Sequence, residues 1–518
     1  MRKLISNHSS RQFLLILISA VLLIFSFPRF SWSFLAWVAL VPLFKALDEK
    51  PPGQRFRLGY LTGILCSLGI FYWVTHSMRH YGGLNPITSF SILFLMVFYL
   101  ALYFGVFAWL WGFYPGKGFF SLFWAPSVWV GLELIRARLL SGFPWALLGH
   151  SQSNYLPVIQ IAEISGVYGI SFLIVLVNQT LYRLFWVDDP FRGWSRKWKE
   201  AVFTLFLFAL TLGFGYYSLM SQAQKDQQVP ALRVAVIQGN IDQSLKWDPA
   251  YQEETIRIYR DLSLEMLPRN PELVIWPETA VPFYFLHENR FTPGLFQLTR
   301  EGQAHLLFGS PALSHWQRET YYYNRAYLLS PEGRIHFYDK VHLVPFGEYI
   351  PLKRFLPFVG KMVQAIGDFS PGKGSYGLPH PKGKIGVLIC FETIFPELSR
   401  AFNREGCRIL VNMTNDAWFG KTSAPYQHLS MLVFRAVENR VWVARAANTG
   451  FSAVIDSSGR IVQRIPLFQT GRIYANIPLR GEKTFYAEHG DWMIILCGII
   501  FLAGIVMAGI KYQRRGKR

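Results

Sequence analysis

The sequence predicts a multi-span α-helical membrane domain joined to one soluble α/β domain, and three observations lead to this prediction. The chain has 518 residues and is 51% hydrophobic, too long for one core and too apolar for an ordinary soluble protein. Long apolar stretches are confined to residues 13–220 and 491–510. Between them, residues 222–489 alternate charged residues, turn residues and short apolar runs, as a globular domain does.

We therefore expect a transmembrane domain over residues 1–221 with about seven helices, a globular domain over 222–489, and a last helix with a basic tail over 490–518. About eight apolar stretches are long enough to be candidate spans. They are residues 13–27, 32–44, 58–74, 87–114, 119–135, 158–185, 201–219 and 492–510. The first resembles a signal peptide, but no small-residue cleavage site follows it, so we keep it as a helix of the mature protein.

The distribution of positive charge predicts the orientation of the spans. The formal net charge is +20, yet Lys and Arg cluster beside apolar spans rather than on one face of a domain, which argues against nucleic-acid binding. With the amino terminus inside, the basic segments 45–57, 115–118, 192–199 and 511–518 all fall on the cytoplasmic side. Both termini are then cytoplasmic, and residues 222–489 face the periplasm of a double-membrane bacterium.

The order of apolar runs in residues 222–489 indicates an α/β layered domain. A strand in LRVAVIQGNI precedes an amphipathic helix at about 249–267, and further strands are expected in ELVIWPE, AHLLFGSPAL, YYYNRAYLLSPEGRI and HFYDKVHLVPF. After them come a buried strand at 385–389, the run CRILVNMTNDAWFG, a helix at about 426–447 and a closing hairpin in FSAVIDSSGRIV. The four cysteines lack metal-ligand spacing, so we expect no metal, no disulfide framework and no cofactor.

Three strand ends carry residues suited to nucleophilic catalysis. Cys390 ends the strand in KIGVLICFETIFPE, where an attacking thiolate belongs, and it needs a base and an oxyanion stabiliser. Glu278 in VIWPETAVP is the candidate base, and Lys340 in FYDKVHLVPFGEYIP is the candidate cation for the thiolate and the oxyanion. His342 and His428 are weaker alternatives for the base, because neither has a recognisable orienting partner in the sequence.

Glu, Lys and Cys in this order, each with its own flanking motif, resemble the nitrilase (carbon-nitrogen hydrolase) superfamily. That resemblance implies a Glu-Lys-Cys triad on an α-β-β-α sandwich. With the membrane spans, the whole chain resembles the membrane branch of that superfamily, the apolipoprotein N-acyltransferases. The motifs that carry this likeness are IQGNIDQSLKWD, VIWPETAVP, YDKVHLVPFGEYIP, CFETIFPE, NMTNDAWFG and, in the membrane part, GFPWALLGHSQ.

The resemblance implies Glu278 as general base, Lys340 as oxyanion-stabilising cation and Cys390 as nucleophile of a two-step acyl transfer. The donor would be a phospholipid, by family analogy phosphatidylethanolamine, and the intermediate a thioester. The acceptor would be the α-amine of the diacylglyceryl-cysteine that begins a bacterial apolipoprotein. Both substrates lie in the bilayer, and we expect a monomer.

Four further residues match positions of functional importance in the family. Glu348 would support the lysine or position substrate, and Trp247 and Glu392 match other such positions. Phe391 stands where the family often has Tyr, so an aromatic packing role is implied and a role for a phenolic hydroxyl is not.

Two segments and two rival functions complete the expectations. Residues 352–374, apolar and flanked by Lys and Gly, are either a mobile lid that dips into the outer leaflet or an ordinary packed helix. The segment LLSGFPWALLGHSQSNYLPVIQ is either a substrate-facing floor or a re-entrant loop with a packing role. The rival functions are a membrane-anchored nitrilase-type amidase and a transporter with a sensing domain. The transporter ranks last. Pairs of ionisable residues would be expected within its spans, and few are present, Glu133 and Glu163 being the main ones.

Overall fold

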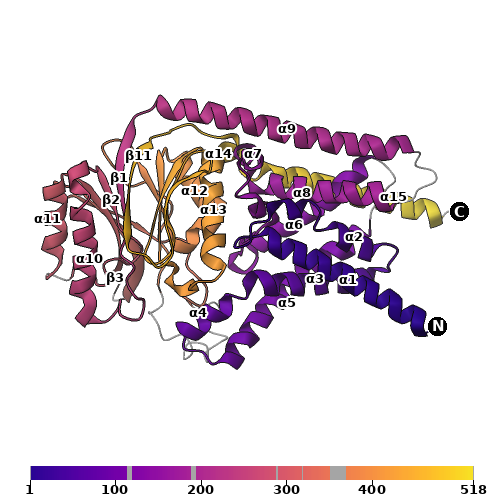
Figure 1. Ribbon diagram of the computed structural model, residues 1–518, viewed down its shortest axis with the longest axis horizontal. Coiled ribbons are helices and arrows are strands. Elements are labelled where there is room, and N and C mark those ends of the chain that lie inside the picture. The colour runs from indigo at the N-terminus through magenta and orange to yellow at the C-terminus, as the bar shows by residue number, and fades with distance from the viewer. Residues whose placement is uncertain are drawn as a thin grey trace. The chain divides into compact units, whose positions relative to one another are not determined.

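The computed structural model describes residues 2–113, 119–187, 194–287, 290–317, 319–349 and 369–516, which divide into two compact units (Figure 1). The first unit comprises Met1–Thr75, Pro86–Leu219 and His489–Arg518, and the second comprises His76–Asn85 and Met220–Glu488. The short segment His76–Asn85 lies between two membrane helices in the sequence, where we expected it to be part of the membrane domain. It belongs instead to the compact unit that contains the α/β domain.

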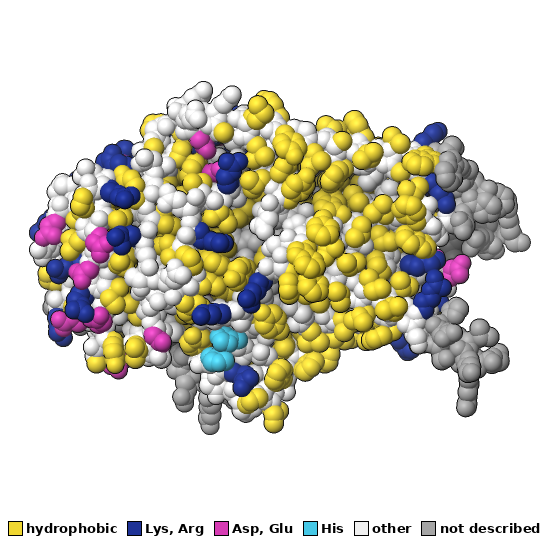
Figure 2. All heavy atoms as spheres, in the orientation of Figure 1, with side chains coloured by type: hydrophobic (Ala, Val, Ile, Leu, Met, Phe, Trp, Pro, Cys, Tyr) yellow, Lys and Arg dark blue, Asp and Glu magenta, His cyan; other side chains and the backbone are white. Residues whose placement is uncertain are grey.

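The first unit is helical. Its helices are α1 (Arg2–Ser26), α2 (Val41–Leu47), α3 (Pro52–Phe71), the start of α4 (Val74–His80), α5 (Pro86–Trp111), α6 (Trp124–Arg138), α7 (Leu156–Ile159), α8 (Ala162–Trp186), most of α9 (Trp194–Gln227) and α15 (Trp492–Gly516). On the face in Figure 2, hydrophobic side chains gather over these helices. Exposed leucines on α5, α9 and α15, such as Leu95, Leu205 and Leu502, suit a lipid-facing surface.

Eight spans are not confirmed. Among the described residues, three helices are long and apolar enough to cross a membrane: α5, α8 and residues Lys197–Gln227 of α9. A fourth is counted if α3 and α4, which meet at a bend of 49°, form one broken span. The stretch expected at 32–44 is split into a 3-10 turn, Ser33–Trp37, and the short α2 with proline in its first turn, and α6 has only 15 residues. Proline cannot donate a helical hydrogen bond, so it favours helix starts over long uninterrupted helices.

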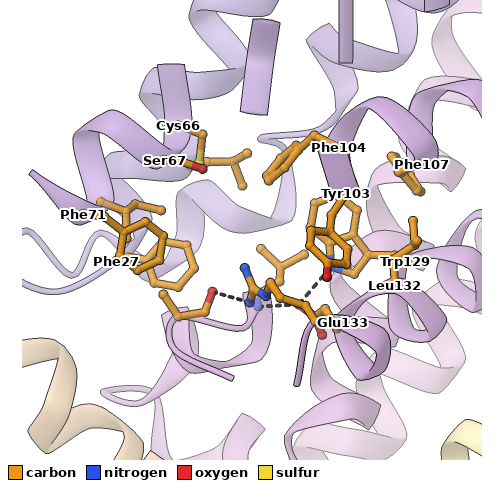
Figure 3. Close-up of a pocket in the computed structure, with 15 residues that line it drawn as sticks. Phe27, Cys66, Ser67, Phe71, Tyr103, Phe104, Phe107, Trp129, Leu132 and Glu133 are labelled. Carbon is orange, nitrogen blue, oxygen red and sulfur yellow. Dashed lines mark hydrogen bonds between the residues drawn. The ribbon is translucent and has the colours of Figure 1, made fainter. Parts of the chain in front are cut away.

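A small cavity lies inside the first unit, beside the segment GFPWALLGHSQ (Figure 3). Its volume is about 50 Å³, and side chains from α1, α3, α5 and α6 line it. Glu133 on α6 accepts hydrogen bonds from Trp129 Nε1 at 3.0 Å and Leu148 N at 2.7 Å, and Arg136 Nη2 donates to the carbonyls of Trp145 and Ala146 at 3.3 Å. These bonds fix the segment against α6.

The second unit contains two β-sheets with helices on their outer faces (Figure 1). One sheet has six strands in the order β11-β1-β2-β3-β4-β5, and the other has five in the order β10-β9-β8-β7-β6. The first sheet comprises β1 (Ala231–Gln238), β2 (Leu273–Ile275), β3 (His305–Trp316), β4 (Glu319–Leu329), β5 (Ile335–Asp339) and β11 (Gly471–Pro478). The second comprises β6 (Ile385–Ile389), β7 (Ile409–Thr414), β8 (Trp442–Ala447), β9 (Ser452–Ile455) and β10 (Ile461–Ile465). The α/β prediction is confirmed.

Among the residues described in this unit, five helices accompany the sheets, and the outer helices bury apolar faces against them. They are α10 (Gln252–Leu264), α11 (Thr292–Gly302), α12 (Pro396–Arg404), α13 (Ala424–Asn439) and α14 (Phe485–His489). On the first sheet, Tyr259 of α10 stacks on Trp276 with ring centroids 5.2 Å apart, and Trp276 Nε1 donates to Ser263 Oγ at 2.8 Å. Trp276 is fully buried, so the chain that leads from β2 to Glu278 is anchored in the core.

One helix boundary was predicted wrongly. Helix α13 ends at Asn439, not near residue 447, because Arg440 adopts a left-handed conformation with φ 50°. Residues Trp442–Ala447 then form β8, which pairs in parallel with β7 and antiparallel with β9. The pairing available in the folded sheet overrides the helical pattern in the sequence. The closing hairpin is confirmed as β9 and β10.

The parallel strands of each sheet end at the same edge, and expected site residues follow them there. β1, β2 and β3 run parallel in the first sheet, and β6, β7 and β8 run parallel in the second. Their carboxyl ends lead into Glu278, Cys390 and Asn415. Ligands and reacting groups commonly lie at such ends, because loops there can present side chains from a rigid sheet.

We predict that Gly309→Ala will displace the backbone of Glu278 and Thr279. A Cβ at residue 309 would lie 2.4 Å from Thr279 N and 2.8 Å from Glu278 Cα, and backbone atoms cannot move aside cheaply. The free energy of unfolding should fall by about 1–3 kcal/mol. Denaturant unfolding of the detergent-solubilised protein measures this change.

Gly294→Ala is the matched control, because a Cβ there meets nothing within 4 Å and the residue lies in α11. That substitution should stabilise the helix by about 0.5–1 kcal/mol. Equal effects at the two glycines would contradict the prediction.

Candidate active site

Glu278, Lys340 and Cys390 are brought together by the fold. Glu278 follows β2, Lys340 follows β5 directly, and Cys390 follows β6 and begins the 3-10 helix Cys390–Ile394. Lys340 Nζ lies 3.6 Å from Glu278 Oε1. Cys390 has φ 51°, a left-handed conformation that places the nucleophile on a sharp turn between the strand and the helix.

The carboxylate of Glu278 is held by two neighbours. Oε1 accepts a hydrogen bond from Asn324 Nδ2 at 2.7 Å, and Oε2 accepts one from the backbone N–H of Asn415 at 3.0 Å. The residue is 7% exposed. Both carboxylate oxygens therefore have a donor, which fixes the orientation of the side chain.

Lys340 forms a buried ion pair with a second carboxylate. Its Nζ lies 2.9 Å from Glu348 Oε1, and Asn324 Nδ2 donates to the same oxygen at 2.9 Å. Lys340 is 1% exposed, and burial alone would lower its pKa, but Glu348 and then Glu278 outweigh burial and raise the pKa. Lys340 therefore stays a cation and is suited to stabilise negative charge rather than to exchange protons. The expected supporting role of Glu348 has a geometric basis in this ion pair.

The surroundings of Cys390 disfavour its thiolate form. The side chain keeps some exposure, but the packed protein around it raises its pKa, and the Glu278 carboxylate raises it further. Lys340 opposes this shift without cancelling it. A thiol in this state needs a base at the moment of attack, and Glu278 is the carboxylate that the fold supplies.

Glu392 connects the two segments that carry Lys340 and Cys390. Its Oε1 accepts hydrogen bonds from Tyr338 Oη at 2.9 Å, Val341 N at 2.7 Å and His342 N at 3.1 Å. Its Oε2 accepts one from Ile389 N at 2.7 Å. Burial raises the pKa of Glu392 to about 7, while the backbone donors oppose that rise. This fully buried residue positions the site and does not face a reacting group.

Phe391 and Trp247 differ in their surroundings. The Phe391 ring packs edge-on against Phe395 with centroids 5.3 Å apart, and the His342 ring lies 6.1 Å from it, which fits the expected aromatic packing role. Trp247 is 36% exposed, so its ring is accessible from solvent. A role for Trp247 stays a prediction. Of the expected lid, residues 352–368 lie outside the part of the chain that the structure describes.

His428 supports the nucleophile's backbone. Its Nε2 lies 3.1 Å from the carbonyl oxygen of Cys390, and its Nδ1 lies 3.0 Å from Asp416 Oδ1. Arg445 Nη2 pairs with Asp416 Oδ2 at 2.5 Å and lies 3.1 Å from His428 Nδ1. Burial and then Arg445 lower the pKa of His428, while Asp416 and the Cys390 carbonyl oppose that shift. His428 thus positions the turn. The His342 ring packs against the Phe395 ring, with centroids 3.6 Å apart and planes tilted by 31°. Glu278 as the base stays a prediction.

Three polar residues of the site were not assigned roles from the sequence. Asn324 lies within β4 and joins Glu278 to Glu348, while the backbone N–H of Asn415 donates to Glu278. Lys246 is 1% exposed, and its Nζ donates to the carbonyl of Glu278 at 3.1 Å. The signal for Lys246 was present, since it stands in the SLKWD motif beside Trp247. Its partner, a backbone carbonyl, cannot be inferred from residue type.

We predict that Glu392→Gln will destabilise the second unit by about 2–4 kcal/mol. An amide nitrogen would replace one oxygen that now faces donors, leaving buried N–H groups without an acceptor. Thermal unfolding of the purified protein measures the loss.

Glu405→Gln is the control, because Glu405 pairs with Lys384 at 3.3 Å and both side chains are about half exposed. That change should cost no more than about 1 kcal/mol. A similar loss in both variants would remove the positioning role assigned to Glu392.

Comparison with known proteins finds relatives for both parts of the chain. Residues 19–180 match the apolipoprotein N-acyltransferase N-terminal domain, and residues 233–484 match the carbon-nitrogen hydrolase domain. An apolipoprotein N-acyltransferase of Geobacter metallireducens is 46% identical over 98% of this chain and 96% of its own. Those of Haemophilus ducreyi and Chlorobaculum tepidum are 34% and 32% identical, over 84% and 99% of this chain and 86% and 99% of their own.

Several solved structures are similar to about half of this chain. An amidase from Nesterenkonia sp. is 20% identical over 50% of this chain and 96% of its own, with a TM-score of 0.38, too low to add to the assignment. The relatives above cover nearly all of the sequence, membrane part included, and the resemblance drawn from the sequence motifs is confirmed. The chain belongs to the apolipoprotein N-acyltransferase family.

Proposed function

We propose that this protein moves an acyl chain from a phospholipid, through a thioester on Cys390, to the α-amine of the diacylglyceryl-cysteine of bacterial apolipoproteins. The observation that carries the proposal is the meeting of Glu278, Lys340 and Cys390 at strand ends, in a chain whose relatives are named apolipoprotein N-acyltransferases. The triad alone also suits an amidase. Membership of this family favours the transferase over that alternative.

In the first step, the sulfur of Cys390 attacks the ester carbonyl of the phospholipid while Glu278 accepts the thiol proton. Negative charge develops on the carbonyl oxygen, and the Lys340 ammonium stabilises it. The C–O bond then breaks, and the departing alkoxide takes the proton from Glu278 to leave as a lysophospholipid. A thioester on Cys390 remains.

In the second step, the α-amine of the acceptor attacks the thioester carbonyl and gives a proton to Glu278. The C–S bond breaks, the amide forms, and the Cys390 sulfur recovers the proton. Lys340 can serve both steps unchanged, since its paired carboxylates keep it charged. The scheme uses the side chains of Glu278, Lys340 and Cys390.

The proposal extends to donor and location. Phosphatidylethanolamine is the proposed acyl donor, and the protein is proposed to be a monomer in the bacterial inner membrane. The arrangement of basic loops supports cytoplasmic termini and a catalytic domain on the periplasmic side. Apolar helices long enough to cross a bilayer support access to substrates that never leave it.

We predict that incubation with phosphatidylethanolamine adds one fatty-acyl mass to the protein, and that hydroxylamine removes it. Cys390→Ala should abolish the adduct, whereas Cys407→Ala should keep it, since Cys407 is a buried free cysteine elsewhere in the same unit. Glu278→Gln and Lys340→Met should each slow adduct formation by about 100-fold or more, because they remove the base and the oxyanion's cation. Intact-mass spectrometry measures all of these.

Addition of a diacylated lipopeptide with a free α-amine completes the test. The acyl mass should leave the protein and appear on the peptide. Loss of the adduct to water with the peptide unmodified would favour the amidase alternative, and absence of any adduct would reject the acyl-enzyme.

A further inference from the structure

A second buried lysine adjoins the candidate base. Lys246 lies in the segment between β1 and α10 and is 1% exposed. Its Nζ donates to the carbonyl oxygen of Glu278 at 3.1 Å and to Thr279 Oγ1 at 2.5 Å. Thr279 has φ 47°, so the ammonium holds a left-handed turn directly after the residue that must accept the thiol proton.

The pairing of Lys246 differs from that of other lysines in the unit. Lys340 contacts Glu348 and Glu278, and Lys382 lies 2.8 Å from Glu272. Among the residues that the structure describes, none places a carboxylate within 4.0 Å of Lys246 Nζ. A buried ammonium bound only to neutral oxygens is costly, so the fold retains this charge without an ion pair to offset it.

The charges around Lys246 give it an electrostatic role. Glu278 and Cys390 are the titratable groups that face the Lys246 ammonium. Lys340 and Glu348 form an ion pair with one another next to Glu278. Asp242, on the same segment as Lys246, accepts a hydrogen bond from Ser244. Burial lowers the pKa of Lys246 to about 8, with Glu278 and Cys390 opposing the shift. The amine is therefore mostly charged at neutral pH and loses that charge just above it.

Lys246 also completes the balance of charge at the site. Glu278 and Glu348 carry two negative charges, and Lys340 carries one positive charge. With Lys246 charged, the cluster is neutral, and it stays neutral when the proton of Cys390 moves to Glu278. Without that charge, a thiolate would form in a buried cluster that already carries a net negative charge, which disfavours ionisation.

We propose that Lys246, which is not a member of the Glu278–Lys340–Cys390 triad, is a positioning residue of the acyl transfer. Its ammonium fixes the turn of Glu278 and Thr279 and must be charged for the Cys390 thiolate to form. This inference rests on the function proposed above, but its first test needs no lipid.

The first test is alkylation of Cys390 by iodoacetamide at pH 7, with the modified cysteine identified by peptide mass. Lys246→Met, which keeps the length and removes the charge, should slow alkylation about tenfold, because a nearby charge shifts a pKa by one unit or more. Lys246→Arg should stay within about twofold of the unmodified protein, since arginine keeps the charge. Lys382→Met is the matched control, because Lys382 also contacts a backbone carbonyl, that of Ala231 at 2.9 Å, away from the site.

The second test is the pH dependence of acyl-enzyme formation from phosphatidylethanolamine. The rate for the unmodified protein should fall as the pH rises through about 8, because Lys246 is charged below that pH and neutral above it. In Lys246→Arg this fall should move to higher pH, since arginine does not lose its proton there. A purely structural role would leave the profile in place.

The outcomes separate the two proposals. Normal alkylation of the unmodified protein without an acyl adduct would overturn the function alone. An adduct together with unchanged alkylation in Lys246→Met, or an Arg variant as slow as the Met variant, would overturn the role of Lys246. If Lys246→Met fails to fold, the pH profiles of acyl-enzyme formation decide the matter. The role of Lys246 is overturned if the rate of the unmodified protein does not fall at alkaline pH, or if Lys246→Arg does not move that fall.

Discussion

The candidate site depends on one buried lysine that lies between two carboxylates. Lys340 contacts Glu348 at 2.9 Å and Glu278 at 3.6 Å, with Asn324 joining the two acids from β4. Removing either acid would leave a buried charge poorly compensated, which proteins tolerate badly. Glu278 follows β2, Asn324 lies within β4 and Lys340 follows β5. The order of these strands in the first sheet therefore determines which charged and polar groups lie next to one another.

The second sheet supplies the nucleophile and one of the hydrogen-bond donors to the candidate base. Cys390 follows β6, and the backbone of Asn415, which follows β7, donates to Glu278. Glu392 joins the Cys390 turn to the backbone after β5, while His428 fixes the carbonyl of Cys390. The site is thus assembled only when both sheets are packed together, so local unfolding of either sheet would separate the base from the thiol.

A piece of chain between membrane helices takes part in the same unit. Ser77 Oγ donates to the carbonyl of Trp418 at 2.7 Å, and the Tyr81 ring packs edge-on against the Trp418 ring at 5.3 Å. Trp418 lies in the short segment that begins with Asn415. This short segment therefore contacts the loop whose first residue donates its backbone N–H to Glu278.

Sequence alone predicted the α/β domain, the apolar segments and the candidate residues Glu278, Lys340 and Cys390, because periodicity and strand-end motifs are local properties of the chain. It could not determine how many helices are long enough to span the bilayer, since proline and packing break apolar runs such as 32–44. Nor could it end α13 at Asn439, where strand pairing overrides helix propensity. Only the tertiary structure revealed Lys246, Asn324 and Asn415 around Glu278, because backbone atoms and residues distant in sequence make those contacts.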